Sequence, residues 1–203
     1  MTRPFIAQTF NIPELKGISR KTIEEHLKLY AGYVKHTNLI LEKIDDLSKD
    51  PEKNSYILSE TQRRFGFEFG GMRNHEYYFR ALEGGGKALF AKSDLRKAIA
   101  KEWGDYEVWV NKFKALAMTR GIGWAILYYD SFSERLVQTW VDEQHMGHLP
   151  GLSFIFGIDM FEHAYMIDYV PGEKKKYIDA YWNSVNFENI EKNFKKATSL
   201  IKI

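Results

Sequence analysis

The stretch Asp159-Met160-Phe161-Glu162-His163-Ala164-Tyr165 directly follows the apolar run Leu152-Ser153-Phe154-Ile155-Phe156-Gly157-Ile158. The run predicts a buried strand that ends on a carboxylate, with an imidazole four residues further along. A carboxylate oxygen and a neutral imidazole nitrogen suit borderline metals such as manganese, iron or zinc. Because a strand is rigid, it can direct these groups into the protein interior. Asp159 and His163 are therefore candidates for part of a metal site.

The composition limits the class of protein and the chemistry of any metal site. The 203 residues are enough to bury a substantial core. A formal net charge of +2 excludes a strongly basic nucleic-acid-binding protein. The absence of cysteine excludes disulfides, thiolate metal sites, iron–sulfur clusters and cysteine nucleophiles. A metal site must therefore be built from His, Asp and Glu.

The sequence carries no signal for a membrane. The N-terminal residues lack the apolar core of a signal peptide. No apolar segment approaches the length needed to span a bilayer, and there is neither an amphipathic anchor nor an extended basic stripe. We therefore expect a cytoplasmic protein with no membrane partner and no nucleic-acid partner.

Two long helices are predicted in the N-terminal part, over residues 20–47 and 60–82. Ser19 can cap the first helix, and its apolar residues recur at helical spacing. Gly84-Gly85-Gly86 ends the second helix and is the candidate domain boundary. We predict an antiparallel α-hairpin domain over residues 1–86 and a second domain over residues 87–203, with the metal site between them.

The second part is predicted to mix helices with a small antiparallel sheet, which makes the fold class α+β. Three β-type runs, residues 122–129, 135–140 and 152–158, would form a three-stranded sheet. The remaining amphipathic segments predict short helices at residues 94–103, 105–117, 175–185 and 187–198.

Further metal ligands should come from the helical part. His26 lies early in the first predicted helix and His75 in the middle of the second, so an antiparallel pair can bring their imidazoles together. Each residue also has a simpler explanation. A single histidine on a helix is more often packed or solvated than a ligand, and Asp159 can merely cap a helix that starts near Phe161.

Several motifs together resemble the iron/manganese superoxide dismutase family, in the same order and over nearly the whole chain. The pattern D-x-[WF]-E-H-A-Y at residues 159–165 is the most specific of them. The others are Lys21-Thr22-Ile23-Glu24-Glu25-His26, Asn74-His75, Gly121-Ile122-Gly123-Trp124-Ala125 and Tyr181-Trp182-Asn183-Ser184-Val185-Asn186-Phe187.

The resemblance implies a fold, a metal and a reaction. It maps four protein ligands onto His26, His75, Asp159 and His163. The implied reaction converts superoxide to dioxygen and hydrogen peroxide by redox cycling of a mononuclear manganese or iron centre. Superoxide is the expected substrate.

The resemblance also implies which residues tune the metal and supply protons. Gln144 is the candidate for the amide that bonds the metal's solvent ligand. Iron-type enzymes instead carry a Gln four residues before the second histidine, where this chain has Gly71. This pattern favours manganese, with iron or the use of both metals as alternatives. Tyr33 and Tyr30 are the rival gateway residues, since the family's His and Tyr at plus four and plus eight are absent.

Four more residues are expected around the ligands or at a subunit interface. Phe161 replaces the usual Trp and keeps an apolar wall, and Trp124 belongs to the segment that resembles the start of the family's sheet. In the family, the equivalent of Glu162 reaches across a dimer interface to the partner's ligand histidine. Tyr165 is expected at the same interface. We therefore expect a homodimer, with a tetramer as a further possibility.

Two other classes of protein fit parts of the pattern. A non-redox metallohydrolase can use three His and one Asp, but it normally needs an additional general base, and the sequence marks none. A structural metal-binding protein would place the same histidines in its core without turnover.

Overall fold

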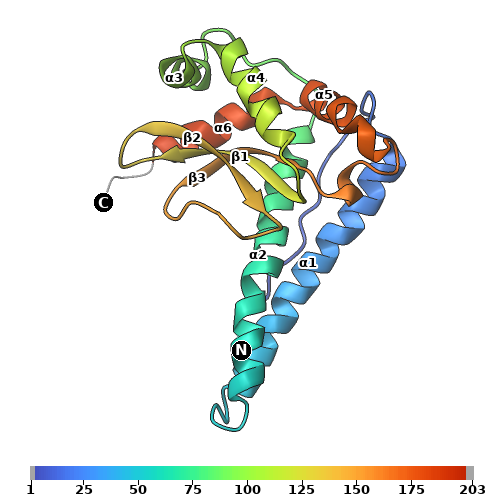
Figure 1. Cartoon of the computed structure of the whole chain (residues 1–203), viewed down its shortest axis with the longest axis vertical. Helices are drawn as coiled ribbons and strands as arrows, with labels where there is room; N and C mark the ends of the chain where they lie inside the picture. Colours follow the sequence, from blue (N-terminus) through green and yellow to red (C-terminus); the bar gives the residue numbers. More distant parts are fainter. Residues whose placement is uncertain (1–2, 200–203) are drawn as a thin grey trace.

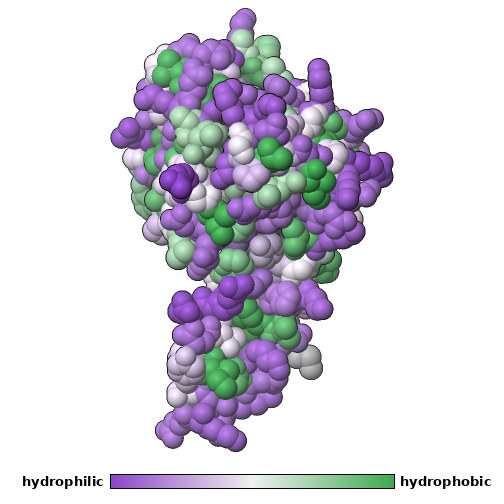
Figure 2. Space-filling model, turned by 45° about the vertical axis from the view of Figure 1, so that its right-hand side comes forward, coloured by the Kyte–Doolittle hydropathy of each residue, from purple (hydrophilic) through white to green (hydrophobic). Residues whose placement is uncertain are grey.

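The chain begins with two long helices that lie side by side (Figure 1). This computed structural model describes residues 3–199. Helix α1 spans Arg20–Leu47 and α2 spans Ser55–Leu82. Ser19 caps α1, because its Oγ accepts a hydrogen bond from the amide of Thr22 at 3.1 Å. The far half of this hairpin projects beyond the rest of the molecule and forms its narrow part (Figure 2).

The second half of the chain forms a three-stranded antiparallel sheet in the order β2-β1-β3. Strand β1 spans Gly123–Asp130, β2 spans Arg135–Asp142 and β3 spans Ser153–Asp159. The central strand β1 is buried along almost its whole length. In its register with β3, Trp124 pairs with Asp159. The end of β3 therefore lies beside the start of β1.

Helices of the second half cover the sheet. Helix α3 spans Asp94–Trp103, α4 spans Tyr106–Ala117, α5 spans Lys174–Ser184 and α6 spans Phe187–Thr198. Helix α4 packs on β1 and β2, while α2 and α6 both pack on β3 (Figure 1). The strand β3 is thereby fixed between the helical hairpin and the C-terminal helix.

An aromatic cluster fills the space between the sheet and these helices. Phe156 of β3 lies at its centre, with ring centroids 5.1 Å from Phe113, 5.6 Å from Trp182 and 5.8 Å from Phe187. All four rings are buried or nearly so. Aromatic pairs at these separations add specific geometry to the burial of large apolar areas.

The segment between the two halves is held in place by backbone contacts. The amide of Lys87 donates to the carbonyl of Val185, and the amide of Phe187 donates to the carbonyl of Lys87, both at 3.0 Å. A Cβ at Gly86 would lie 2.1 Å from the carbonyl oxygen of Asn183, so this close approach requires glycine. The division into domains at residue 86 stays a prediction.

The predicted fold class is confirmed, with two long helices followed by a mixed part with a three-stranded antiparallel sheet. The start of α2 differs, because the helix begins at Ser55 rather than at residue 60. Its first turn exposes Tyr56 and Ile57, so no buried stripe marked it in the sequence. Among the described residues, no helix combines the length and apolar character needed to cross a membrane.

Candidate metal centre

The two carboxylate oxygens of Asp159 face different partners. Its Oδ1 accepts a hydrogen bond from the amide of Phe161 at 2.8 Å. Its Oδ2 faces three imidazoles, and the whole side chain is fully buried. The backbone carbonyl of Asp159 accepts a further hydrogen bond from the hydroxyl of Tyr177 at 2.9 Å. Asp159 thus forms an Asx turn with Phe161 directly after β3 and still offers one oxygen to a metal.

Three imidazoles from three separate elements surround that oxygen. The Nε2 atoms of His26 in α1, His75 in α2 and His163 lie 3.2, 3.4 and 3.1 Å from Oδ2 of Asp159. His163 belongs to a short 3-10 turn, Glu162–Ala164. One ligand atom from each of the four residues lies within 4.8 Å of the others. The structure therefore brings together the four residues that the sequence marks as candidate ligands.

The orientation of His75 is set by its second nitrogen. Its Nδ1 lies 2.6 Å from the carbonyl of Gly71, and a carbonyl only accepts, so Nδ1 carries the proton. Its Nε2 then presents a lone pair to the centre. Among the described residues, this buried atom has no hydrogen-bond partner. An unpaired nitrogen beside two further imidazoles and a carboxylate fits a three-nitrogen, one-oxygen site for manganese or iron.

Burial controls the protonation of these ligands. Burial, followed by the nearby charge of His26, lowers the pKa of His75 to about 3. Burial also lowers the pKa of His26. For Asp159, burial alone would raise the pKa, but the charge of His163 and hydrogen bonds from His163 and His26 lower it overall. At neutral pH, His26 and His75 are neutral and Asp159 is ionised, as metal ligation requires.

Gln144 joins the surroundings of the centre into one hydrogen-bonded chain. Its Oε1 accepts from the indole Nε1 of Trp124 at 2.9 Å, and its Nε2 donates to the hydroxyl of Tyr33 at 3.1 Å. Gln144 is fully buried. The ring of Tyr33 lies 5.1 Å from that of His75. Gln144 thereby connects β1, α1 and a ligand on α2.

Two glycines of α2 make room for this chain. A Cβ at Gly71 would lie 2.5 Å from the ring of Tyr33, and one at Gly70 would lie 2.1 Å from the carbonyl oxygen of Gln144. The carbonyl also accepts from Nδ2 of Asn74 at 3.1 Å. The pair Gly70 and Gly71 thus lets Tyr33 and Gln144 approach the helix that carries His75.

The two gateway candidates point to different places. Tyr33 contacts Gln144, whereas the hydroxyl of Tyr30 donates to Glu76 at 3.2 Å and accepts from the amide of Gln8 at 2.9 Å. Helix α1 is α-helical from end to end, without an inserted residue. A residue seven positions after His26 therefore stays on the ligand's face, which explains the position of Tyr33.

The remaining candidates, Phe161, Glu162 and Tyr165, flank His163 in the chain. The ring of Phe161 stacks on that of His163 at 5.0 Å and 20°. Tyr165 is buried and stacks on Tyr177 at 5.3 Å, while Glu162 is exposed. Tyr177, whose hydroxyl donates to the backbone carbonyl of Asp159, is not among the residues predicted from the sequence. No local pattern pointed to it, because the contact joins α5 to the end of β3.

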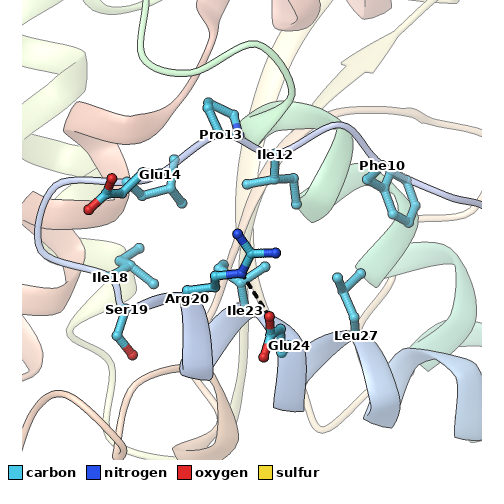
Figure 3. Close-up of a pocket in the computed structure, with 11 residues that line it drawn as sticks. Phe10, Ile12, Pro13, Glu14, Ile18, Ser19, Arg20, Ile23, Glu24 and Leu27 are labelled. Carbon is cyan, nitrogen blue, oxygen red and sulfur yellow. Dashed lines mark hydrogen bonds and ion pairs between the residues drawn. The ribbon is translucent and has the colours of Figure 1, made fainter.

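A surface groove of about 500 Å³ lies on another flank of α1. Figure 3 shows Phe10 and Ile12 of the N-terminal segment opposite Ile23 and Leu27 of α1. None of the four candidate ligands lines it. The groove is therefore separate from the metal centre.

Comparisons with known proteins agree with this geometry. The family model "Iron/manganese superoxide dismutases, C-terminal domain" matches residues 91–193. A protein of Aquifex pyrophilus named superoxide dismutase (Fe) is 37% identical over 188 residues, which cover 90% of this chain and 87% of that protein. The chain belongs to the iron/manganese superoxide dismutase family.

Relatives of both metal types match this superoxide dismutase. One from Sulfolobus acidocaldarius, named superoxide dismutase (Fe), is 33% identical over 186 residues, or 88% of this chain and 86% of its own. One from Mycolicibacterium fortuitum, named superoxide dismutase (Mn), is 32% identical over 177 residues, or 86% of this chain and 83% of its own. The expected enzyme class is confirmed, and its metal is iron or manganese.

Metal-free enzyme should lose stability as the pH falls below about 6.5. An unfolded histidine binds a proton near its ordinary pKa of 6.5, whereas folded His75 binds it only near 3. Between these values the unfolded state holds more protons, so the free energy of unfolding falls by up to about 1.4 kcal/mol per pH unit for this group. Denaturant unfolding of chelator-treated protein between pH 7.5 and 4.5 measures the slope.

Matched variants identify the source of this slope. His75→Asn should reduce the slope and leave the part due to His26, whereas His36→Asn, which removes an exposed imidazole from α1, should leave the slope unchanged. A stability of the metal-free enzyme that does not change between pH 7.5 and 4.5 would contradict the assignment of buried, neutral imidazoles.

Proposed function

We propose that this superoxide dismutase works with manganese held by His26, His75, Asp159 and His163. Iron, or the use of both metals, is the alternative. The proposal rests on the segment of the chain that provides the buried side-chain amide next to the metal site. Gln144 comes from the loop after β2 and bonds both Tyr33 and Trp124. The place where a side chain at Gly71 would lie is filled by the ring of Tyr33. This arrangement resembles the manganese type.

The bound ion supplies one-electron redox chemistry, so that two superoxide anions and two protons give dioxygen and hydrogen peroxide. The protein contributes three neutral imidazoles and a single carboxylate. This donor set cancels only one positive charge of the ion, so the site attracts a small anion.

In this proposal Tyr33 donates the protons, and the carboxamide of Gln144 holds its hydroxyl in place. Gln144 donates one N–H to the oxygen of Tyr33, which leaves the phenol proton of Tyr33 free to be donated. Burial raises the pKa of Tyr33, so its hydroxyl stays protonated at neutral pH. Tyr33 is only partly buried and therefore connects solvent with the buried amide. Tyr30 is bonded to Gln8 and Glu76 and serves the N-terminal segment instead.

Enzyme loaded separately with each metal tests this proposal. Superoxide dismutation per bound ion should be at least about tenfold higher with manganese than with iron, which corresponds to about 1.4 kcal/mol of transition-state stabilisation. Gln144→Ala should lower activity about tenfold and keep the metal content. The control Gln62→Ala removes an exposed amide from α2 and should change neither. Equal or iron-only activity would contradict the choice of manganese, and an unchanged Gln144→Ala would contradict the role of the amide.

We also propose that the enzyme is a homodimer that buries the surface around Glu162. Three apolar residues close to His163 are exposed, namely Met166 at 46%, Ile167 at 44% and Val170 at 61%. Exposed apolar residues that cluster in one short segment are typical of an interaction surface. Glu162 is exposed in the same short turn as His163, and in the proposed dimer it reaches the partner's His163.

Mass measurement in solution tests the dimer. The wild-type enzyme should elute with the mass of two chains, and Ile167→Glu should shift it toward one chain because a charge is then placed in an apolar contact. Phe132→Glu changes a residue that is 71% exposed in the β1–β2 turn and should leave the mass unchanged. A monomeric wild type at micromolar concentration would contradict the dimer, and a mass of four chains would support the tetramer.

A further inference from the structure

The loop that carries Gln144 adopts a backbone conformation that its surroundings must hold. It follows β2, and the amides of Asp142 and Met146 each donate to the other's carbonyl, at 2.8 and 3.1 Å. Glu143 has a φ of 49°, in the left-handed region that residues with a Cβ rarely adopt. Such a conformation is unfavourable for a residue with a side chain and persists where neighbouring contacts impose it. The position of Gln144 therefore depends on the contacts that hold this conformation.

Two donors from different elements meet on the carbonyl oxygen of Gln144. Asn74 of α2 donates from Nδ2 at 3.1 Å, and Nε2 of His148 lies at 3.1 Å on the same oxygen. A carbonyl oxygen can only accept hydrogen bonds and has two lone pairs, so these two donors together occupy both. Helix α2 also lies against this oxygen at Gly70, where a Cβ would be only 2.1 Å from it.

The proton positions on His148 follow from these partners. Its Nε2 must carry the hydrogen that the carbonyl of Gln144 accepts. In the neutral ring, its Nδ1 is then an acceptor, and the hydroxyl of Tyr128 is hydrogen-bonded to it. Tyr128 lies on the central strand β1 and is only 3% exposed. The imidazole of His148 is thus a rigid bridge between the core of the sheet and the backbone of Gln144.

We propose that His148, held by Tyr128, is a positioning residue for the carboxamide of Gln144; this rests on the proposed role of Gln144 in dismutation. The carboxamide is bonded at its oxygen by Trp124 and at its nitrogen by Tyr33. His148 bonds the backbone of the same residue. A displacement of that backbone therefore changes the distance from the amide to the metal centre, where errors of about 0.5 Å already matter.

Redox titration of the metal-loaded enzyme tests this inference. His148→Phe keeps a planar ring and removes both hydrogen bonds. It should shift the midpoint potential by about 40 mV, which is a fivefold change for a one-electron couple, and lower kcat about fivefold, the effect of one lost neutral hydrogen bond. Tyr128→Phe should shift the midpoint potential and kcat in the same direction as His148→Phe, but by less. This second variant tests the inference if His148→Phe does not fold. Metal content should stay at the wild-type level.

Two controls separate this inference from the role of Gln144 itself. Tyr106→Phe removes a buried hydroxyl from α4 and should change neither potential nor kcat. In a Gln144→Ala background, His148→Phe should add no further shift. An additional shift there, or an unchanged potential in His148→Phe while Gln144→Ala shifts it, would overturn the positioning role alone. An unchanged potential in Gln144→Ala would instead overturn the role of Gln144, and the inference with it.

Discussion

The rest of the metal centre depends on the carboxylate of Asp159, whose two oxygens face different partners. One oxygen accepts the amide of Phe161 and so fixes the turn that carries His163. The other oxygen faces the Nε2 atoms of His163, His26 and His75. Because β3 is packed between α2 and α6, the carboxylate is presented from a rigid strand rather than from a mobile loop. A single side chain thereby both shapes the turn after β3 and offers an oxygen to a metal.

The site also joins the two halves of the chain. Two candidate ligands come from the hairpin of α1 and α2, and two come from the end of β3 and the turn after it. The same connection continues through Gln144, which is bonded to Tyr33 of α1 and to Trp124 of β1. Close approach along this line depends on the absence of side chains at Gly70 and Gly71. Packing of the halves and chemistry of the centre therefore rest on the same contacts.

Local patterns predict much of this structure, and tertiary contacts account for the rest. Caps and helical periodicity predict α1 with its observed ends, and the strand-then-carboxylate pattern predicts Asp159 and His163 as ligands. Spacing alone cannot choose between Tyr30 and Tyr33, because both lie within two turns of His26. In the structure, the hydroxyl of Tyr30 is hydrogen-bonded to Gln8 and Glu76, whereas that of Tyr33 is hydrogen-bonded to Gln144. The bridge from Tyr128 through His148 has no periodic signature, since its partners come from a strand, a loop and a helix.

The metal content and activity of Asp159→Asn test the central claim most directly. Asparagine keeps the shape and an oxygen that can accept the amide of Phe161, but it removes the negative charge that the three imidazoles surround. Wild-type enzyme should bind one manganese or iron ion per chain and dismutate superoxide. The variant should keep its helical circular dichroism, lose stoichiometric metal and lose activity. A folded variant that retains one ion per chain with wild-type turnover would contradict the account.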